Sequence, residues 1–424
     1  MSLLLFHTLA CLMPVEPVDS SSRGDSAPEV DSVPLVDTDE PPVSTDSVGD
    51  QPVEELDDAF FSAEVIHTIA ITIPEEGEAA LAASPYDKTL GDVVIDGVML
   101  PDVGVRLRGK IGYFRDLNGK PKFAVDLNYT NVEQRYYGIE ELSLNNEVVD
   151  CSYLKEPLAY RIFRDAGIPA PRTSFARVSV NGGDYGLYVV VETPDDRFLK
   201  RNYTDSSGNL YDGKYVYYED HSYTLLDFTP TTQDLFQLEE GADVGHADVY
   251  GVVDAIGTTG GANEWYDAVN AVVDLHQVET YLAVEELVGH NDGYALNTNN
   301  YRFYFDPSNA GRMTFIPWDF DYGFLHDYEW GFSWHSPSGV LADSCFHSTR
   351  CAGEHKDAVR DLLKTYDGAA LQTWFDELQA LIANDVATDP RRECAIESVL
   401  TYQDAVRAWL VTEPDNLKSA WSIE

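Results

Sequence analysis

Alternating apolar and polar positions predict a series of β-strands along the chain. Residues 65–73 alternate as a half-buried strand does. Residues 93–100 carry Asp96-Gly97 at their centre, and this dipeptide is typical of a tight hairpin turn. Further strands are predicted at residues 103–107, 123–127, 178–180, 186–192, 301–305 and 313–317. Most of these segments lie in the first half of the chain, which is therefore expected to be rich in strands.

Apolar residues at helical spacing predict helices further along. In residues 152–166, Leu154, Leu158 and Ile162 recur on one face, and Gly167 ends the segment. The same spacing predicts a helix over residues 274–289 and helices in the C-terminal part, where Leu371, Trp374, Phe375, Leu378 and Ile382 share a face. Residues 202–263 have no clear period and are predicted to be rich in loops. The pattern predicts an α+β fold of two lobes, with a strand-rich N-terminal half and a helical C-terminal half.

The segment before the first predicted strand has a different composition. Residues 15–58 consist mostly of Ser, Pro, Val, Asp and Glu, with Arg23 as their only cation. A segment with few aromatic residues and a high net charge cannot repay the entropy of ordering. We therefore predict a disordered acidic linker over residues 12–58 and one folded domain over residues 59–424.

The first eleven residues are mostly apolar and end in Leu9-Ala10-Cys11. This ending resembles that of a bacterial lipoprotein signal, and it predicts a shortened signal over residues 1–11 with Cys11 acylated. The alternative is an apolar start without function. The sequence contains no run of about 20 apolar residues, so no transmembrane helix is predicted. We expect membrane contact only through the lipid anchor, and a domain outside the cytoplasm, at a cell surface or secreted.

The charge of the chain is extreme. It has 28 Lys and Arg against 73 Asp and Glu, which gives a net charge of −45. A surface with this charge repels nucleic acid and anionic membranes, which argues against both as partners. It favours a cationic partner, although such charge also serves simply to keep a surface solvated.

Four cysteines follow Cys11 in the sequence, an even number that favours two disulfides in an exported protein. Cys345 and Cys351 are close enough in sequence to close a small ring, which leaves Cys151 to pair with Cys394. The chain has no Cys-x-x-Cys pair, so a structural zinc site is not predicted.

The densest group of Asp and Asn residues follows the helix predicted at mid-chain. Asp292 comes first, Asn297 and Asn300 a few residues later, and Asp319 and Asp321 after the second of two strands. Phosphoryl transfer needs a carboxylate near the attacking hydroxyl and oxygen ligands for Mg²⁺. The spacing from Asp292 to Asn297 matches that of a protein-kinase catalytic loop. The alternative is a structural turn or a calcium-binding loop.

Cations on adjoining predicted strands form a second candidate group. Arg106 and Arg108 lie on one strand and Lys122 on the next, where they would make a positive site for phosphate within an acidic chain. The alternative is that they pair with neighbouring acids. A lysine that grips phosphates needs a carboxylate to hold it, and by analogy with kinases we expect Glu156 to do so.

Four segments resemble, in order, the motifs of the CotH (spore coat protein H) family of atypical protein kinases. They read VGVRLRGKIGY…KPKFAVDLN, LSLNNEVVDCSYLKEPLAYRIFRDAGIPAPR, VNGGDYGLYVVVE and FIPWDFDYGF. The resemblance runs from about residue 66 to residue 324 and fades in the helices beyond. The sequence departs from the family pattern after Arg108-Gly109, where Lys110-Ile111-Gly112 replaces an Asn/Ser-rich stretch, and at Lys155, where arginine is usual.

The resemblance implies a kinase-like fold that binds ATP and Mg²⁺, with Mn²⁺ or Ca²⁺ as alternatives, and phosphorylates Ser or Thr of a protein substrate. By motif position, Asp292 is the candidate base and Asp319 the leading metal ligand. The other implied roles are metal ligands at Asp321, Asn297 or Asn300, phosphate contacts at Lys122 and Arg108, and a nucleotide contact at Glu192, where the second hairpin leads toward the second lobe. The choice between Asn297 and Asn300 stays open.

Three functions compete on this reading. The first is a protein kinase, acting on a substrate that the net charge predicts to be basic. The second is a surface adhesion or wall-binding module that keeps the fold and binds Ca²⁺ or nothing, because an exported protein meets little ATP. The third, a glycoside hydrolase, has carboxylates and tryptophans but no spacing that singles out an acid–base pair.

Overall fold

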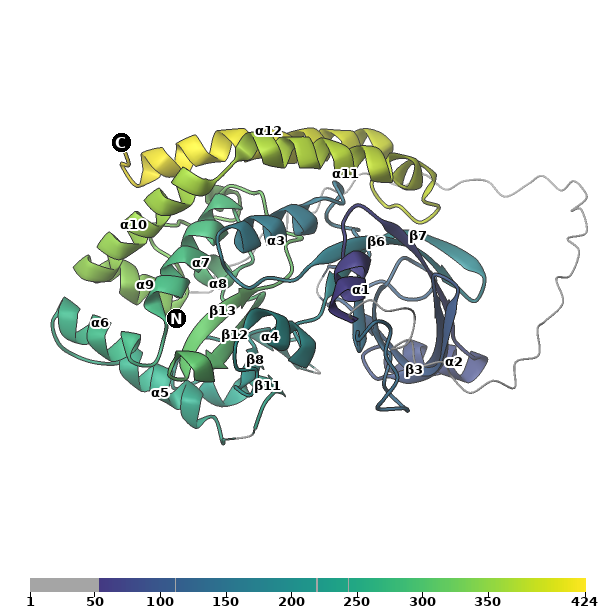
Figure 1. Ribbon diagram of the computed structural model, residues 1–424, viewed down its shortest axis with the longest axis horizontal. Coiled ribbons are helices and arrows are strands. Elements are labelled where there is room, and N and C mark those ends of the chain that lie inside the picture. Colours follow the sequence, from purple (N-terminus) through teal and green to yellow (C-terminus); the bar gives the residue numbers. More distant parts are fainter. Residues whose placement is uncertain (1–52, 111, 219, 243) are drawn as a thin grey trace, which may run out of the picture. The chain divides into compact units, whose positions relative to one another are not determined.

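A computed structural model describes residues 53–424 except 111, 219 and 243 (Figure 1). The predicted lipoprotein signal at residues 1–11 and residues 12–52 of the predicted linker lie outside the described residues. The rest is a mixed α+β fold, with strands dominating the first half and helices the second. That coarse expectation is confirmed.

Strands of the first half close into a barrel in the order β1-β2-β3-β4-β5-β7-β6. Neighbours are antiparallel except β1 and β6, whose parallel pairing closes the barrel. The bounds are β1 (Ile66–Thr72), β2 (Thr89–Ile95), β3 (Val98–Arg108), β4 (Lys122–Asp126), β5 (Glu141–Asn145), β6 (Thr173–Val180) and β7 (Gly183–Glu192). Their alternating inward residues fill the interior with Val, Ile, Leu and Phe side chains. The period-two pattern predicted these strands except β5, and it did not predict their closure into a barrel.

The second half contains a four-stranded sheet covered by helices. Its order is β11-β8-β12-β13. The strands are β8 (Leu210–Asp212), β11 (Gln237–Glu240), β12 (Tyr301–Asp306) and β13 (Arg312–Pro317), with a separate pair, β9 (Val216–Tyr217) and β10 (Tyr223–Thr224). The helices are α5 (Ala247–Ile256), α6 (Ala262–Asn270), α7 (Leu275–Leu287), α8 (Tyr294–Asn297), α9 (Val340–His347), α10 (Thr349–Thr365), α11 (Gly368–Thr388) and α12 (Ile396–Ala420). Figure 1 shows α11 and α12 side by side. No helix of the described residues has the length and apolar character needed to span a bilayer.

The predicted and observed elements agree best where the periodic pattern of apolar residues extends over at least five residues. The helix predicted at 274–289 is α7, and the strands predicted at 301–305 and 313–317 are β12 and β13. The prediction that residues 202–263 are rich in loops misses α5 and the strands β8 and β11. Strands of three or four residues are too short to show a period, and only the pairing of β8 with β12 and of β11 with β8 reveals them.

Helix α3 (Lys155–Asp165) lies between two barrel strands in the sequence but packs against both β6 and α7. It is the helix predicted at 152–166, and α4 (Asp196–Asn202) follows the last barrel strand. Asp150 accepts hydrogen bonds from the backbone amides of Ser152 and Lys155, which starts α3. The start of α3 lies beside the end of β5, because the buried Glu156 accepts a hydrogen bond from Asn145.

The folded domain begins earlier than the sequence suggested. Helix α1 (Val53–Phe60) occupies the end of the range predicted as linker. Its Asp57 is buried and forms ion pairs with Arg172 at 2.6 Å and Arg197 at 2.8 Å. Composition could not show this boundary, because the pairing cations come from distant parts of the chain.

Both predicted disulfides are confirmed, Cys151–Cys394 and Cys345–Cys351. The first links the segment before α3 to the segment between α11 and α12. Asp389 of the latter forms a buried ion pair with Lys120 at 2.7 Å. The C-terminal helices are thus fastened to the barrel.

Candidate active site

A cavity of about 480 Å³ lies where the barrel meets the second half of the fold. The barrel contributes Arg106, Arg108 and Lys122, and the connecting segment after β7 contributes Thr193, Pro194 and Asp195. The second half contributes Asp212, Lys214, Asp292, Asn299, Asn300, Arg302, Trp318, Asp319 and Asp321. Both groups predicted from the sequence, the Asp/Asn group and the cation group, therefore reach one cavity.

The loop after α7 is held in place by a buried glutamate. Glu285 accepts hydrogen bonds from the backbone amides of Tyr294, at 2.7 Å, and Ala295, at 3.0 Å. Burial raises the pKa of Glu285 to about 8, although these amides oppose the shift. The contact fixes the start of α8, and with it the turn that carries Asp292.

Three carboxamides surround Asp292. Its carboxylate accepts hydrogen bonds from Asn297 at 2.5 Å, from Asn299 at 3.2 Å and from Asn300 at 2.9 Å. Burial raises the pKa of Asp292 to about 7, against the effect of these donors. The Asp292 carboxylate is therefore held in a fixed orientation, and its pKa lies near neutral pH, as a proton acceptor at physiological pH requires.

The structure separates the two asparagines that the sequence left open. Asn300 lines the cavity together with Asn299, whereas Asn297 touches Asp292 but is not among the lining residues. Asn300 has the left-handed conformation with φ of +50°, which asparagine tolerates better than most residues. Asn299 was missed by sequence reasoning, although the run of asparagines at 297–300 was a signal for it.

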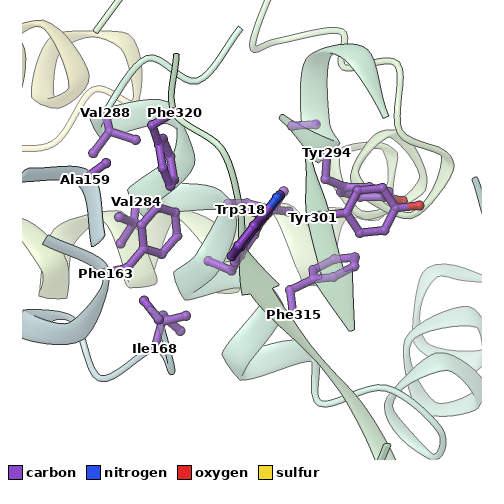
Figure 2. Packing of buried hydrophobic residues seen from close by; sticks show 14 of the residues in the cluster. Ala159, Phe163, Ile168, Val284, Val288, Tyr294, Tyr301, Phe315, Trp318 and Phe320 are labelled. Atoms are coloured by element: carbon purple, nitrogen blue, oxygen red, sulfur yellow. The ribbon is translucent and has the colours of Figure 1, made fainter. Parts of the chain in front are cut away.

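Asp319 and Asp321 flank Phe320 in the turn after β13. Phe320 is buried against the ring of His290, at 4.3 Å between centroids. Figure 2 shows Phe320 among apolar side chains from α3 and the α7 region, namely Ala159, Phe163, Val284 and Val288. The carbonyl of Asp319 accepts a hydrogen bond from His290 Nε2 at 2.8 Å. Because Phe320 anchors the turn in the core, both aspartates can line the cavity.

Lys122 lies between these two aspartates. Its Nζ is 2.6 Å from Asp321 Oδ2 and 3.5 Å from Asp319 Oδ2. Burial alone would lower the pKa of Lys122, but the two carboxylates raise it well above its ordinary value. Burial likewise opposes ionisation of Asp319, yet Lys122 and Arg108 hold the pKa of Asp319 below its usual range. The site thus carries a charged lysine beside a charged aspartate.

Glu156 does not hold Lys122 as expected, and this is a correction. Its Oε2 accepts a hydrogen bond from Asn145 Nδ2 at 2.6 Å, and no ion pair joins it to Lys122 among the described residues. Burial and the charge of Asp319 raise the pKa of Glu156 to about 8. Asp319 and Asp321 carry negative charge nearer to Lys122, and sequence spacing could not rank these distances.

Arg108 and Arg302 flank the ring of Trp318 on the cavity wall. Their guanidinium carbons lie 5.5 and 4.8 Å from the ring centroid. Arg108 also donates to the hydroxyl of Ser143 on β5, two strands away in the barrel. The predicted position of Arg108 in the site is therefore found. Arg302 was missed, because a single arginine in a buried strand has no sequence signature.

Glu192 does not line the cavity. Its carboxylate forms ion pairs with Arg172 at 2.6 Å and Arg201 at 2.5 Å. Burial opposes ionisation, but the two arginines lower the pKa of Glu192. The Glu192 side chain thus stabilises the end of β7 through its ion pairs. The segment that borders the cavity is the next one, residues 193–195.

Comparison with known proteins now identifies the family. The family model described as "CotH kinase protein" matches residues 105–411, more than half of the chain. The chain belongs to the CotH kinase family. The match continues through α10, α11 and most of α12, where the motif resemblance had faded. The CotH match includes every site residue discussed above, from Arg108 to Asp321.

One curated CotH relative is the inner spore coat protein H of Bacillus subtilis (strain 168), which is 27% identical over 192 residues. That match covers 44% of this chain and 50% of the relative, so the chain spans about half the length of the curated relative. Among solved structures, the Helicobacter pylori proinflammatory kinase CtkA aligns over 70% of this chain and 90% of its own, at 11% identity and a TM-score of 0.28. With a TM-score this low, the alignment supports no conclusion about the fold or the function of this chain.

Proposed function

We propose that this CotH family member is a protein kinase that transfers the γ-phosphoryl group of ATP to Ser or Thr of a protein substrate. The proposal includes an atypical, two-lobed kinase-like arrangement, with the cavity between the lobes. The observation that carries it is the convergence of Asp292, Lys122, Asp319 and Asp321 on one cavity. These are the residue types that phosphoryl transfer requires, and they come from separate parts of the chain.

Asp319, Asp321 and Asn300 would hold Mg²⁺, with Mn²⁺ as an alternative. Their oxygens suit a hard cation, and Asp321 Oδ1 is buried without a hydrogen-bond partner. When bound with ATP, Mg²⁺ supplies positive charge that neutralises the phosphate oxygens. Lys122 would exchange part of its contact with Asp321 for a phosphate oxygen.

Cationic side chains on the cavity wall would orient the phosphates. Arg106, Arg108, Lys122, Lys214 and Arg302 line the cavity, in a chain with only 28 Lys and Arg. Arginine donates in a planar fork that matches phosphate geometry. The guanidinium groups of Arg108 and Arg302 also contact the ring of Trp318, which helps to hold them.

Asp292 would accept the proton of the substrate hydroxyl as its oxygen attacks the γ-phosphorus and the bond to the β-phosphate breaks. Asn297, Asn299 and Asn300 hold its carboxylate in place. The pKa of about 7 places the change from acid to base within the physiological range.

The substrate would be a basic segment that carries Ser or Thr. The cavity is also lined by carboxylates, namely Asp126, Glu140, Glu141, Asp195, Glu239 and Glu240. These acids and the net charge of −45 would attract Lys and Arg near the acceptor hydroxyl. The protein would act outside the cytoplasm, with Cys11 as a lipid anchor, a location that the two disulfides and the spore coat relative support.

Phosphate incorporation into the full-length protein and into basic Ser-containing peptides tests the proposal. With Mg²⁺ or Mn²⁺ and labelled ATP, the wild type is expected to transfer phosphate. The variant Asp292→Asn is expected to keep ATP binding but to lose transfer, by about 10³-fold. Asp220→Asn, in an exposed turn, serves as the control. A folded wild type that neither binds ATP nor transfers phosphate would refute the kinase and favour the adhesion module.

The rate of transfer is expected to depend on pH through Asp292. A base must be deprotonated, so kcat should rise with pH through about 7 and then level off, because the pKa of Asp292 is raised to about 7 by burial. The measurement is kcat between about pH 5.5 and 9 at saturating Mg²⁺ and ATP, a range that extends well to either side of that pKa. A profile that stays flat across it would show that Asp292 is not the base.

A further inference from the structure

Buried oxygen atoms without hydrogen-bond partners gather on three residues outside the lining of the cavity. They are Asn145 Oδ1, Asn146 Oδ1 and both carboxylate oxygens of Glu147. Glu147 is only 2% exposed. Most buried polar atoms in folded proteins are hydrogen bonded, so such acceptors on three consecutive residues require a physical explanation.

The orientation of the two asparagines is set by their donors. Asn145 Nδ2 donates to Glu156 at 2.6 Å, and Asn146 Nδ2 donates to the carbonyl of Lys120 at 2.5 Å. Turning either amide over would put its oxygen against another acceptor. The free atoms are therefore oxygens, and they are acceptors for which the described part of the protein supplies no donor.

The charge around Glu147 is predominantly negative. Glu147 interacts electrostatically with Glu156, Asp150 and Asp321, and less strongly with Lys122. The buried Lys120 also interacts with Glu147, but its Nζ forms an ion pair with Asp389 at 2.7 Å. Lys122 is engaged elsewhere, since its Nζ lies 2.6 Å from Asp321. Buried carboxylates are costly unless they are paired or coordinate a metal.

Lys155, which precedes Glu156 in α3, is also engaged. The Nζ of Lys155 donates to the backbone carbonyl of Asp321 at 3.0 Å. It therefore contacts the turn that carries Asp321 and makes no ion pair with Glu147 among the described residues. Glu147 also adopts a left-handed backbone conformation, with φ of +55°.

We propose that Glu147, Glu156 and Asn145 bind a hard divalent cation at a second site, separate from the one at Asp319 and Asp321. All three offer oxygen, which selects Mg²⁺, Mn²⁺ or Ca²⁺ over softer metals. None of the three lines the cavity, and the site does not depend on the proposed phosphotransferase activity.

Coordination at this site requires a small rearrangement. Among the described residues, these acidic side chains do not by themselves bring three ligand oxygens within 4.8 Å of one another. The carboxamide oxygen of Asn145 is therefore a necessary ligand. Because neither oxygen of Glu147 is hydrogen bonded, its carboxylate can turn toward the cation without breaking a bond. A cation there would bind the ionised forms of Glu147 and Glu156, and Lys122 would remain in contact with Asp321 at the cavity.

The test is the number of Mn²⁺ ions bound per chain by the full-length protein without nucleotide, measured by equilibrium dialysis. The Asp319→Asn variant, which lacks the leading ligand of the other site, is expected to retain one bound Mn²⁺. Adding Glu147→Gln is expected to remove that ion and the increase in Tm that Mn²⁺ produces. The amide keeps the size of the side chain, so the metal-free Tm should not fall.

Glu286→Gln is the matched control, because Glu286 is also a buried glutamate but accepts a hydrogen bond from Trp421 at 2.9 Å. It should leave Mn²⁺ binding unchanged. Equal Mn²⁺ binding with and without Glu147→Gln, or no binding by the Asp319→Asn variant, would overturn the proposal. If Asp319→Asn does not fold, the single Glu147→Gln variant must bind one ion fewer than the wild type. Phosphate transfer is measured separately, so the two proposals can fail independently.

Discussion

Replacing Asp319 by asparagine is expected to lower phosphoryl transfer on the order of 10³-fold, because it removes a charge that the proposed Mg²⁺ site needs. The substituted amide would keep the size of the side chain, and the backbone carbonyl at this position would still accept the hydrogen bond from His290. Lys122 would also keep its closer partner, since Asp321 lies at 2.6 Å and Asp319 at 3.5 Å. The loss should therefore appear in activity and in metal-dependent ATP binding, with little change in Tm.

The measurement is kcat and ATP affinity at several Mg²⁺ concentrations. If metal binding limits the Asp319→Asn enzyme, a high Mg²⁺ concentration should restore part of its rate. High Mg²⁺ should not restore the rate of Asp292→Asn, because the Asp292 carboxylate is held by hydrogen bonds from carboxamides. Unchanged transfer by the Asp319→Asn variant would remove this residue from the metal site and with it the main support for the proposed mechanism.

Replacing Lys122 by methionine is expected to cost about 3 kcal/mol of folding free energy at neutral pH. Lys122 is 4% exposed and is the cation between Asp319 and Asp321. Without it, two neighbouring carboxylates stay buried with no lysine between them, and burial already raises the pKa of Asp321 to about 6. Denaturant unfolding of the wild type and the variant measures the difference.

Mg²⁺ is expected to restore part of this stability, because a cation held by Asp319 and Asp321 replaces the missing ammonium group. Lys120→Met is the matched control. Lys120 is also buried and forms an ion pair with Asp389 at 2.7 Å, away from the cavity lining. Both variants should lose stability, and Mg²⁺ should stabilise Lys122→Met more than Lys120→Met, because only in Lys122→Met does the cation also replace the ammonium group between Asp319 and Asp321. Equal responses of the two variants to Mg²⁺ would contradict the assignment of Asp319 and Asp321 as ligands.

Sequence reasoning succeeded where chemistry is carried by local spacing. The group from Asp292 to Asn300 lies within one loop, and Asp319 and Asp321 belong to one turn, so their proximity follows from short separations. The order of motifs also sufficed to recognise the family, which the match over residues 105–411 confirms. The disulfide pairs were predicted from the proximity of Cys345 and Cys351, which left one pairing for the other two cysteines.

The sequence-based predictions failed where the partner of a charged side chain depends on its distance in the folded protein. Glu156 and Glu192 were assigned to Lys122 and to the nucleotide by analogy, but Glu156 accepts from Asn145 and Glu192 pairs with Arg172 and Arg201. An ion pair depends on separations of a few ångströms. Spacing along the chain does not specify such distances.

By itself, the sequence determined the strand-rich first half, the helical second half, the family and the residue types of the site. The tertiary structure alone decided the closure of the barrel by β1 and β6, the partners of Lys122, and the burial of Glu147 without a hydrogen-bond partner among the described residues. The physical reason is the range of the interactions. Periodicity and turn chemistry act between residues a few positions apart and are visible in any sequence. Barrel closure, ion pairing and desolvation act between residues far apart in sequence, and these come together only when the whole chain has folded.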